Sequence, residues 1–337
     1  MTCRNYFNVR SSWCARLCLV PTWVLILPTL AFTEGRGAFD PGLELKRQGC
    51  AEIELRRTAE HHLFVFGQVN GRQRSVLVDT GWSLTTVAKR SASKLKTPAQ
   101  LGLKSTDTFF SANEQSAMVM IETLKLGRVT LTNQPAVERD LTFGGQPAPF
   151  EVVLGCDFLL RHRAIIDCGN GRLFLRTRAP EAAGTAGFSK VMRDAGYSPV
   201  ELKIIPRPLA MVCNASLNQT PLRLLVDTAA VWSCVDTRAA EQLGLKLSPT
   251  PRRISGVGKT GIRHFAVTTA DSLSFGDATI NRVNLAVFDL AAWGLAEPDT
   301  ALGEVRGILG GPELAERQAI IDCGQRTLWL KTTPKRK

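Results

Sequence analysis

Short apolar runs broken by turn-forming residues make up most of the chain after residue 60. The first two, residues 63–66 and 75–78, flank an Asn70-Gly71 pair, and this arrangement is a strong signal for a β-hairpin. Three short stretches have helical composition instead: residues 88–95, 157–161 and 238–243. Many short strands with few helices predict a mostly β chain with barrel-like lobes.

The strand pattern occurs twice along the chain. Residues 77–81 (LVDTG) match residues 225–229 (LVDTA) at a separation of 148 positions. Further on, residues 165–169 (IIDCG) match residues 320–324 (IIDCG) at a separation of 155 positions. The constant order indicates a duplicated unit with one insertion in its second copy, which we place in residues 290–299. A repeat of this length in two copies predicts a pair of lobes and not a solenoid.

The repeat and the composition between its copies divide the chain into six parts. We expect a signal peptide or N-terminal anchor (residues 1–31), a lead-in segment (32–58), a first lobe (59–179), an Ala- and Gly-rich linker (180–198), a second lobe (199–332) and a basic tail (333–337).

The N-terminal segment has the pattern of an export signal. Three arginines precede an apolar run over residues 17–32, and residues 1–31 contain no acidic residue. The run is shorter than the about 20 residues that a membrane helix needs, and residues 29–31 (TLA) offer a small-residue cleavage site. We therefore expect either cleavage or an uncleaved membrane tether. In both cases the body is exported: periplasmic, secreted or membrane-anchored outside the cytoplasm.

The net charge does not indicate a particular class of binding partner. Of the formal +12, residues 1–31 contribute +3 and residues 331–337 contribute +4, which leaves a mild +5 for the body. No basic stripe interleaved with aromatic residues is visible in the sequence, so we expect no nucleic-acid partner.

Cysteine and histidine positions do not indicate a metal site. The six cysteines after the leader form no C-x-x-C pair, which argues against zinc. They can form disulfides in an exported chain or stay as buried thiols that behave as small apolar residues. His61 and His62 lack an acidic or cysteine partner at ligand spacing, so we expect them at the surface or at a strand edge. We expect no metal and no cofactor.

Candidate chemistry lies in the two triplets that end the apolar runs. Asp79 and Asp227 occupy equivalent places in the two copies, and two carboxylates placed in this way suggest a shared catalytic centre. The pattern resembles the retropepsin-like aspartic proteases. The resemblance rests on the apolar-Asp-Thr-Gly triplet, on a downstream apolar strand that ends in Gly155 or Gly310, and on the helix after it, over residues 60–332.

The resemblance implies a fold and an activity. The expected fold is mostly β, with two pseudo-symmetric retropepsin-like β-barrel lobes (the acid-protease fold) in one chain, and hence a monomer that is an internal pseudo-dimer. The implied activity is that of an exported aspartic endopeptidase acting on a protein or peptide substrate. As is known for aspartic proteases, two carboxyls at close range cannot both ionise and share one proton. One of Asp79 and Asp227 then activates water while the other donates a proton, and the pair titrates as a unit.

Supporting residues follow from the same resemblance. Thr80 and Thr228 are expected to hydrogen-bond across the lobes, and Gly81 is expected to allow a tight turn. The second triplet departs from the family pattern because Ala229 replaces glycine. Its methyl group removes the freedom to adopt positive φ, so we expect activity to be retained if φ is negative there.

The flaps also differ between the copies. Gly256, Val257, Gly258 and Gly261 lie in a stretch that resembles a glycine-rich flap closing over substrate, whereas residues 106–117 of the first copy contain no glycine. Our hypothesis is a single working flap, from the second lobe.

The residues after the triplets suggest a working pH. Trp82 and Ala230 stand where many acid-active relatives have Ser or Thr. Without hydroxyl donors to lower the pKa values of the carboxyls, we expect a working range from weakly acidic to neutral.

Two further functions fit the same sequence. The first is a catalytically silent module that uses the same lobes to bind an extended peptide by strand addition. The second is a structural envelope protein, which would depend on neither Asp79 nor Asp227.

Overall fold

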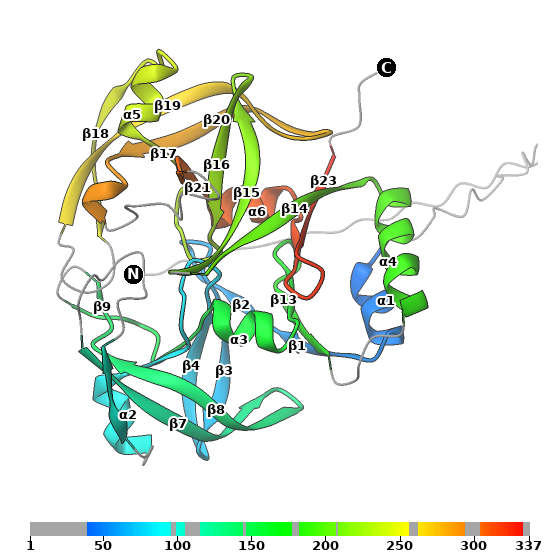
Figure 1. The fold of residues 1–337 in the computed structure, drawn as a ribbon, viewed down its shortest axis with the longest axis vertical. Helices are drawn as coiled ribbons and strands as arrows, with labels where there is room; N and C mark the ends of the chain where they lie inside the picture. Colours follow the sequence, from blue (N-terminus) through cyan, green and yellow to red (C-terminus); the bar gives the residue numbers. More distant parts are fainter. Residues whose placement is uncertain are drawn as a thin grey trace, which may run out of the picture. The chain divides into compact units, whose positions relative to one another are not determined.

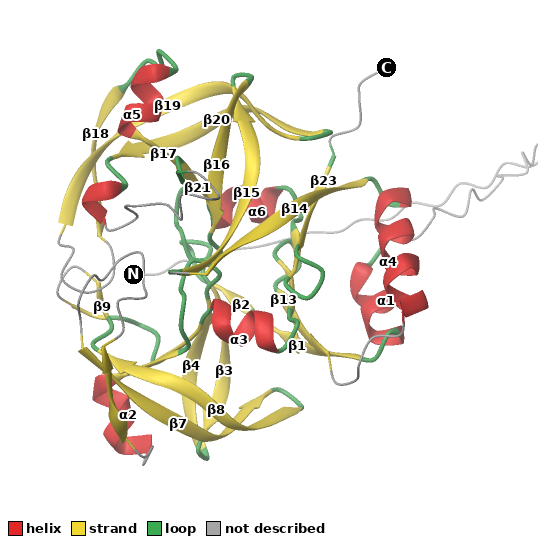
Figure 2. Ribbon diagram, in the orientation of Figure 1, coloured by secondary structure: helices red, strands yellow, loops and turns green. Residues whose placement is uncertain are grey.

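β-Strands form two barrel-like lobes and a sheet that joins them (Figures 1 and 2). The computed structural model describes residues 39–95, 99–104, 115–143, 146–176, 182–206, 208–255, 262–293 and 304–332. Residues from Asp40 onward belong to one compact unit. The chain is therefore mostly β, as the pattern of short apolar runs predicts.

The first lobe contains an eight-stranded sheet in the order β2-β3-β4-β11-β5-β8-β7-β6, and pairing of β3 with β7 closes it. Its strands are β2 (Arg56–Arg57), β3 (Leu63–Val69), β4 (Arg72–Val78), β5 (Thr86–Ala88), β6 (Ala99–Lys104), β7 (Gln115–Leu126), β8 (Val129–Arg139) and β11 (Val152–Leu154). Helices α2 (Lys89–Leu95) and α3 (Cys156–Arg161) and the small pair β9 (Thr142–Phe143) and β10 (Gln146–Pro147) complete it.

The second lobe repeats this order as β15-β16-β21-β17-β20-β19-β18, and pairing of β15 with β19 closes it. Its elements are β15 (Leu209–Leu217), β16 (Thr220–Val226), β17 (Cys234–Asp236), α5 (Thr237–Gln242), β18 (Ser248–Ser255), β19 (Ile262–Phe275), β20 (Ala278–Phe288), η2 (Ala291–Trp293), β21 (Gly307–Leu309) and α6 (Gly311–Glu316). In chain order, strands β3, β4, β5 and β6 of the first lobe correspond to β15, β16, β17 and β18 of the second. This correspondence confirms the duplicated unit.

The joining sheet brings the two IIDCG repeats side by side. Its order is β1 (Cys50–Glu54), β13 (Arg172–Arg176), β12 (Ile165–Asp167), β22 (Ile320–Asp322), β23 (Thr327–Lys331) and β14 (Tyr197–Pro206). Strands β12 and β22 are antiparallel, with Ile166 opposite Ile321. The local two-fold axis of the repeat therefore passes through this pair. Because all three residues of each strand are buried, the two lobes share an apolar core here.

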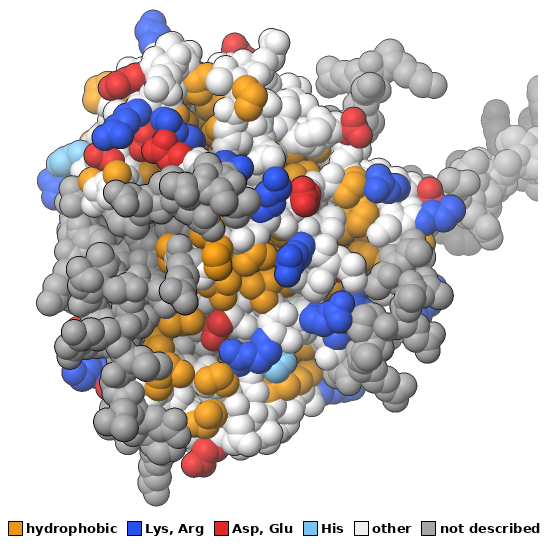
Figure 3. Space-filling view, viewed as in Figure 1, with side chains coloured by type: hydrophobic (Ala, Val, Ile, Leu, Met, Phe, Trp, Pro, Cys, Tyr) orange, Lys and Arg blue, Asp and Glu red, His pale blue; other side chains and the backbone are white. Residues whose placement is uncertain are grey.

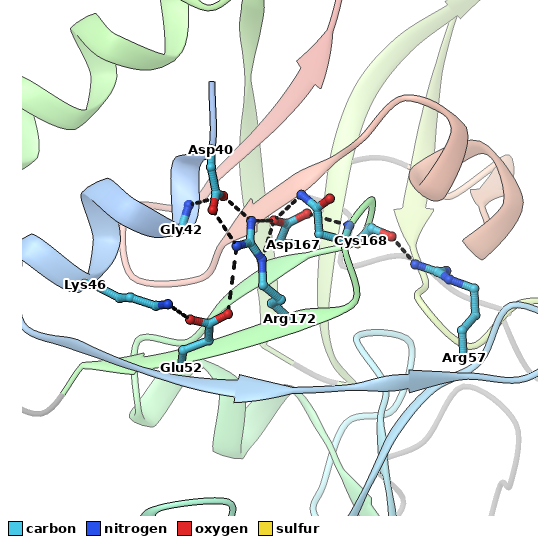
Figure 4. Close-up of polar contacts among 9 residues, drawn as sticks. Asp40, Gly42, Lys46, Glu52, Arg57, Asp167, Cys168 and Arg172 are labelled. Carbon is cyan, nitrogen blue, oxygen red and sulfur yellow. Dashed lines mark hydrogen bonds and ion pairs between the residues drawn. The ribbon is translucent and has the colours of Figure 1, made fainter. Parts of the chain in front are cut away.

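Helix α1 (Pro41–Arg47) begins where the described chain begins, and it contacts α4 (Ala182–Asp194) at the right of Figure 1. Asp40 caps α1 by accepting a hydrogen bond from the Gly42 N–H at 2.9 Å. Arg172 donates to Asp40 at 3.0 Å and to Asp167 at 2.6 Å, so that one guanidinium links α1 to the joining sheet (Figure 4). Hydrogen bonding from Arg172 lowers the pKa of Asp40.

Helix α4 lies in the stretch that we expected as a linker. Residues 180–198 contain the whole of α4 and the first two residues of β14. The alanines in this stretch favour a helix, and the apolar side chains of Phe188 and Met192 are buried. The composition of the stretch thus reflects a packed helix. The lead-in segment likewise holds α1, β1 and β2.

Of the two states that the sequence allowed for the cysteines, the structure has the buried thiol. The six cysteines of the described chain are free and buried: Cys50, Cys156, Cys168, Cys213, Cys234 and Cys323. Burial raises the pKa of Cys213 to about 12, so the thiolate that would react is suppressed. These residues act as small apolar core side chains.

Charged and hydrophobic side chains are distributed differently on the surface. On the face seen in Figure 3, lysines and arginines are interspersed with acidic residues, and hydrophobic side chains gather between the two lobes. Across the ranges that the structure describes, no helix is long and apolar enough to cross a membrane.

Candidate active site

The two triplets form loops at the ends of equivalent strands. Strands β4 and β16 end at Val78 and Val226, and each pairs in parallel with a short central strand, β11 or β21. The central strand holds the start of each loop, because the N–H of Asp79 donates to the carbonyl of Leu154 at 3.1 Å and that of Asp227 to Leu309 at 3.0 Å. The strand pairing thus places both carboxyls at the same depth in their lobes.

Glycine follows each central strand for a steric reason. A Cβ atom at Gly155 would lie 2.8 Å from the Trp82 carbonyl oxygen, and one at Gly310 would lie 2.7 Å from the Trp232 carbonyl oxygen. Both distances are too short for real side chains. These two glycines therefore let the triplet loops pack against the strands that support them.

Four hydrogen bonds connect the two loops through their threonines. The Thr80 N–H donates to Thr228 Oγ1 at 3.1 Å, and the Thr228 N–H donates to Thr80 Oγ1 at 3.0 Å. Each hydroxyl in turn donates across the lobes, from Thr80 to the Val226 carbonyl at 2.7 Å and from Thr228 to the Val78 carbonyl at 2.8 Å. Both side chains are buried. The loops are thereby fixed relative to each other.

The two aspartates meet between these loops. Asp79 is 8% and Asp227 is 5% exposed, and their carboxyl groups are hydrogen-bonded to each other. Asp79 Oδ1 accepts from the Gly81 N–H at 2.8 Å, and Asp227 Oδ1 accepts from the N–H groups of Ala229 and Ala230 at 2.8 and 2.9 Å. Backbone donors from each loop thus orient the carboxyl group of that loop.

Burial raises the pKa of both carboxyls. For Asp79 the charge of Asp227 adds to the effect of burial, and its pKa is raised well above the usual range. For Asp227 burial also raises the pKa, while the N–H groups of Ala229 and Ala230 act in the opposite direction. Two like charges in contact and out of water favour a state with one shared proton. The pair can therefore offer one base and one acid at the same pH.

Comparison with known proteins identifies the family. A family model described as "Aspartyl protease" matches residues 65–158 and 213–312, and so covers more than half of the chain. The chain belongs to the aspartyl protease family. The two matched regions fall on the two lobes, which confirms the resemblance inferred from the triplets.

A solved aspartic proteinase structure agrees with this chain at the level of the fold. The crystal structure of aspartic proteinase from Irpex lacteus superposes with a TM-score of 0.50 at 16% identity, over 85% of this chain and 98% of that one. A retropepsin-like aspartic protease from Rickettsia conorii matches with a TM-score of 0.29 at 19% identity, over 37% of this chain and 90% of that one. A search of curated proteins finds no match.

Ala229, the departure from the family triplet, causes no backbone strain. Its φ angle is not positive, and neither is that of Gly81. The methyl group packs against an apolar cluster of the first lobe that includes Trp82 and Phe150. At Gly81, in contrast, a Cβ atom would lie 2.3 Å from Asp227 Cγ. The glycine of the first triplet is thus required by space, whereas the second loop accommodates alanine.

The side chains after the triplets provide no hydroxyl to the carboxyls. The indole of Trp82 is buried, and its Nε1–H donates to Thr86 Oγ1 at 2.7 Å. Ala230 contributes only its backbone N–H. Within the described chain, the donors hydrogen-bonded to the two carboxyls are backbone N–H groups and the carboxyls themselves.

Sequence reasoning missed one residue beside the site. His62, in the connection between β2 and β3, hydrogen-bonds the carbonyl of Ala229, and burial lowers its pKa. Its ring packs edge-on against Phe150 at 5.8 Å between centroids. No local signal could have revealed this contact, because it joins a connection of the first lobe to the loop of the second. His62 is a positioning contact for that loop.

The expected flap residues Gly256, Val257, Gly258 and Gly261 lie outside the described residues. Strands β18 and β19 lead into that stretch and out of it. In the part of the chain that the structure describes, no group of three or more His, Cys, Asp or Glu side chains could hold a metal ion.

Proposed function

We propose that this aspartyl protease family member is an exported endopeptidase that hydrolyses peptide bonds with a water molecule activated by Asp79 and Asp227. The observation that carries the proposal is the contact between two buried carboxyls in loops fixed by Thr80 and Thr228. Both triplets come from one chain, so a monomer suffices to complete the site.

In the proposed reaction the ionised carboxyl removes a proton from water, whose oxygen attacks the carbonyl carbon of the peptide. The protonated carboxyl donates its hydrogen bond, and then its proton, to the carbonyl oxygen. The resulting tetrahedral diol collapses as the C–N bond breaks: the carboxyl that took the water proton gives it to the leaving nitrogen, and one diol hydroxyl returns its proton to the other carboxylate as the C=O bond re-forms. The products are a carboxylic acid and an amine, and the pair returns to its singly protonated state.

The decisive test compares the full chain with its Asp79→Asn variant on a mixed peptide library across pH. Loss of one member of an acid–base pair is expected to reduce kcat/KM by about 10²–10⁴-fold. Asp271→Asn, an exposed aspartate on β19, serves as the matched control and should keep full activity. A statine-type mimic of the tetrahedral intermediate should block the wild type.

A second outcome would favour peptide binding over catalysis. If folded wild type binds peptides but cleaves none at any pH, the silent module replaces the protease, and Ala229→Gly is the first reversion to try. Export rests on the leader pattern alone, and N-terminal sequencing of chain recovered outside the cytoplasm tests it. A chain found only in the cytoplasm would contradict export and leave the proposed chemistry unaffected.

A further inference from the structure

A cavity of about 570 Å³ in the second lobe is lined in part by Trp232, the fifth residue after Asp227. Its lining includes Trp232, Lys246 and Arg252, together with the hydroxyl residues Ser248 and Thr250. Among the described residues that line it, none is aspartate or glutamate. The cavity therefore combines an aromatic wall, two positive charges and small polar groups.

Arg252 is held in place at this cavity. Its guanidinium carbon lies 4.9 Å from the centroid of the Trp232 ring, and Trp232 in turn packs against Phe265 at 5.8 Å. Stacking on an aromatic ring fixes the plane of a guanidinium and leaves its N–H groups free to donate. Among the described residues, no ion pair involves Arg252 or Lys246.

The position of the cavity relates it to the proposed catalytic pair. Trp232 follows Asp227 by five residues, so their Cα atoms are at most about 17 Å apart. An extended peptide advances about 3.3 Å per residue. An extended peptide bound at Asp227 that runs past Trp232 would therefore meet the cavity within about five residues of the bond that is cut.

The stretch of sequence that contains Lys246 and Arg252 is more basic than its counterpart in the first lobe. Between Glu241 and Asp271 there are five basic residues and no acidic one. The equivalent stretch of the first lobe, residues 94–122, has three basic and three acidic residues. A concentration of one charge beside a cleft attracts ligands of the opposite sign.

We propose that this cavity is a specificity subsite that selects an acidic side chain, Asp or Glu, of the peptide substrate. The carboxylate accepts hydrogen bonds from the fork of Arg252, and Lys246 adds a second positive charge. The inference rests on the proposed protease function, and it names the class of substrate that this site takes.

The test measures kcat/KM of the full chain on matched peptides that carry Glu, Gln or Lys at one position within five residues of the cut. We expect Glu to exceed Gln by about tenfold at one position, as a charge-assisted hydrogen bond allows. This preference should weaken as salt is added. Arg252→Glu should invert it in favour of Lys. Arg253→Glu is the control, because it makes the same charge change on the same strand at an exposed residue that does not line the cavity.

A binding arm separates failure of the subsite from failure of the protease. The same peptides are titrated against Asp79→Asn by fluorescence anisotropy. Cleavage without a Glu preference, or a preference that Arg252→Glu leaves unchanged, overturns the subsite and leaves the protease standing. Binding that favours Glu and inverts in Arg252→Glu, without any cleavage by wild type, supports the subsite and overturns the protease. Neither cleavage nor charge-dependent binding overturns both.

Discussion

The two lobes have the same strand order but support their Asp-Thr-Gly and Asp-Thr-Ala loops with different side chains. In the first lobe, Thr85 donates through its N–H and its hydroxyl to Asp157 in α3, both at 2.7 Å. In the second, Ser233 donates to Glu313 in α6 and accepts from the Gly310 N–H at 2.8 Å. Asp157 and Glu313 occupy different positions in their helices. The carboxylate has moved along the helix while the loop that it anchors has stayed in place.

The glycine packing and the threonine hydrogen bonds differ less between the two lobes than these supporting side chains do. Gly155 and Gly310 meet the same steric limit, and the threonine bonds are nearly equal in length in both directions. The comparison teaches that strand pairing and close packing determine where the loops lie. Individual side chains can then diverge, as Ala229 and the basic cavity of the second lobe have done.

The largest effect is expected from exchanging the third residue of each triplet. Gly81→Ala places a methyl group on the Asp227 carboxyl, because the Cβ position is 2.3 Å from Cγ. We expect loss of at least about 100-fold in kcat/KM, as displacement of a catalytic group by about 1 Å produces. Ala229→Gly should change kcat/KM by less than about threefold, since no strain is present to relieve. Equal losses of kcat/KM in the two variants would show that the two loops do not differ in the space they leave for a side chain at the third triplet position.

Removing one threonine hydroxyl at a time tests the symmetry of the cross-lobe bonds. Thr80→Val leaves the Thr228 N–H and the Val226 carbonyl buried without partners. Thr228→Val leaves the Thr80 N–H and the Val78 carbonyl in the same state. Each should lower the free energy of unfolding by about 2–4 kcal/mol, measured by urea denaturation. Thr130→Val, at an exposed position of β8, is the control and should change little. If the two variants lose unequal amounts of unfolding free energy, the hydrogen bonds made by one threonine contribute more to stability than those made by the other.

The sequence was sufficient to predict the features of the fold that follow from periodic and repeated patterns. The duplicated triplets and the IIDCG segments predicted two lobes, and the structure pairs those segments as β12 and β22. In both segments the aspartate caps the turn that follows: Asp167 accepts from the Asn170 N–H at 2.9 Å, and Asp322 accepts from the Gln325 N–H at 2.8 Å.

Contacts between distant parts of the chain could not be read in this way. His62 meets Ala229, Arg172 joins Asp40 to Asp167, and Arg252 stacks on Trp232, each across connections that no local pattern reveals. The linker composition was ambiguous for a related reason. Alanine and glycine suit both a loose segment and a packed helix, and only the burial of Phe188 and Met192 decides for α4.

The smallest expected effect concerns pH. Burial raises the pKa of Asp79 and Asp227, and hydrolysis needs one of them ionised. The rate should therefore fall as the pH drops below the raised pKa, which acts in the same direction as the weakly acidic to neutral range expected from the sequence. Ala230→Ser adds a hydroxyl at the residue whose N–H already donates to Asp227. A new donor stabilises the ionised carboxyl and lowers its pKa.

The acid limb of the kcat/KM profile for Ala230→Ser should then move to lower pH by about one unit, the size expected for one hydrogen bond to a charged group. Ala292→Ser, at an exposed position of η2, is the matched control and should leave the profile in place. An unchanged acid limb in Ala230→Ser would mean that the missing hydroxyl does not set the working pH. The difference between this lobe and acid-active relatives would then have to lie in the burial of the pair itself.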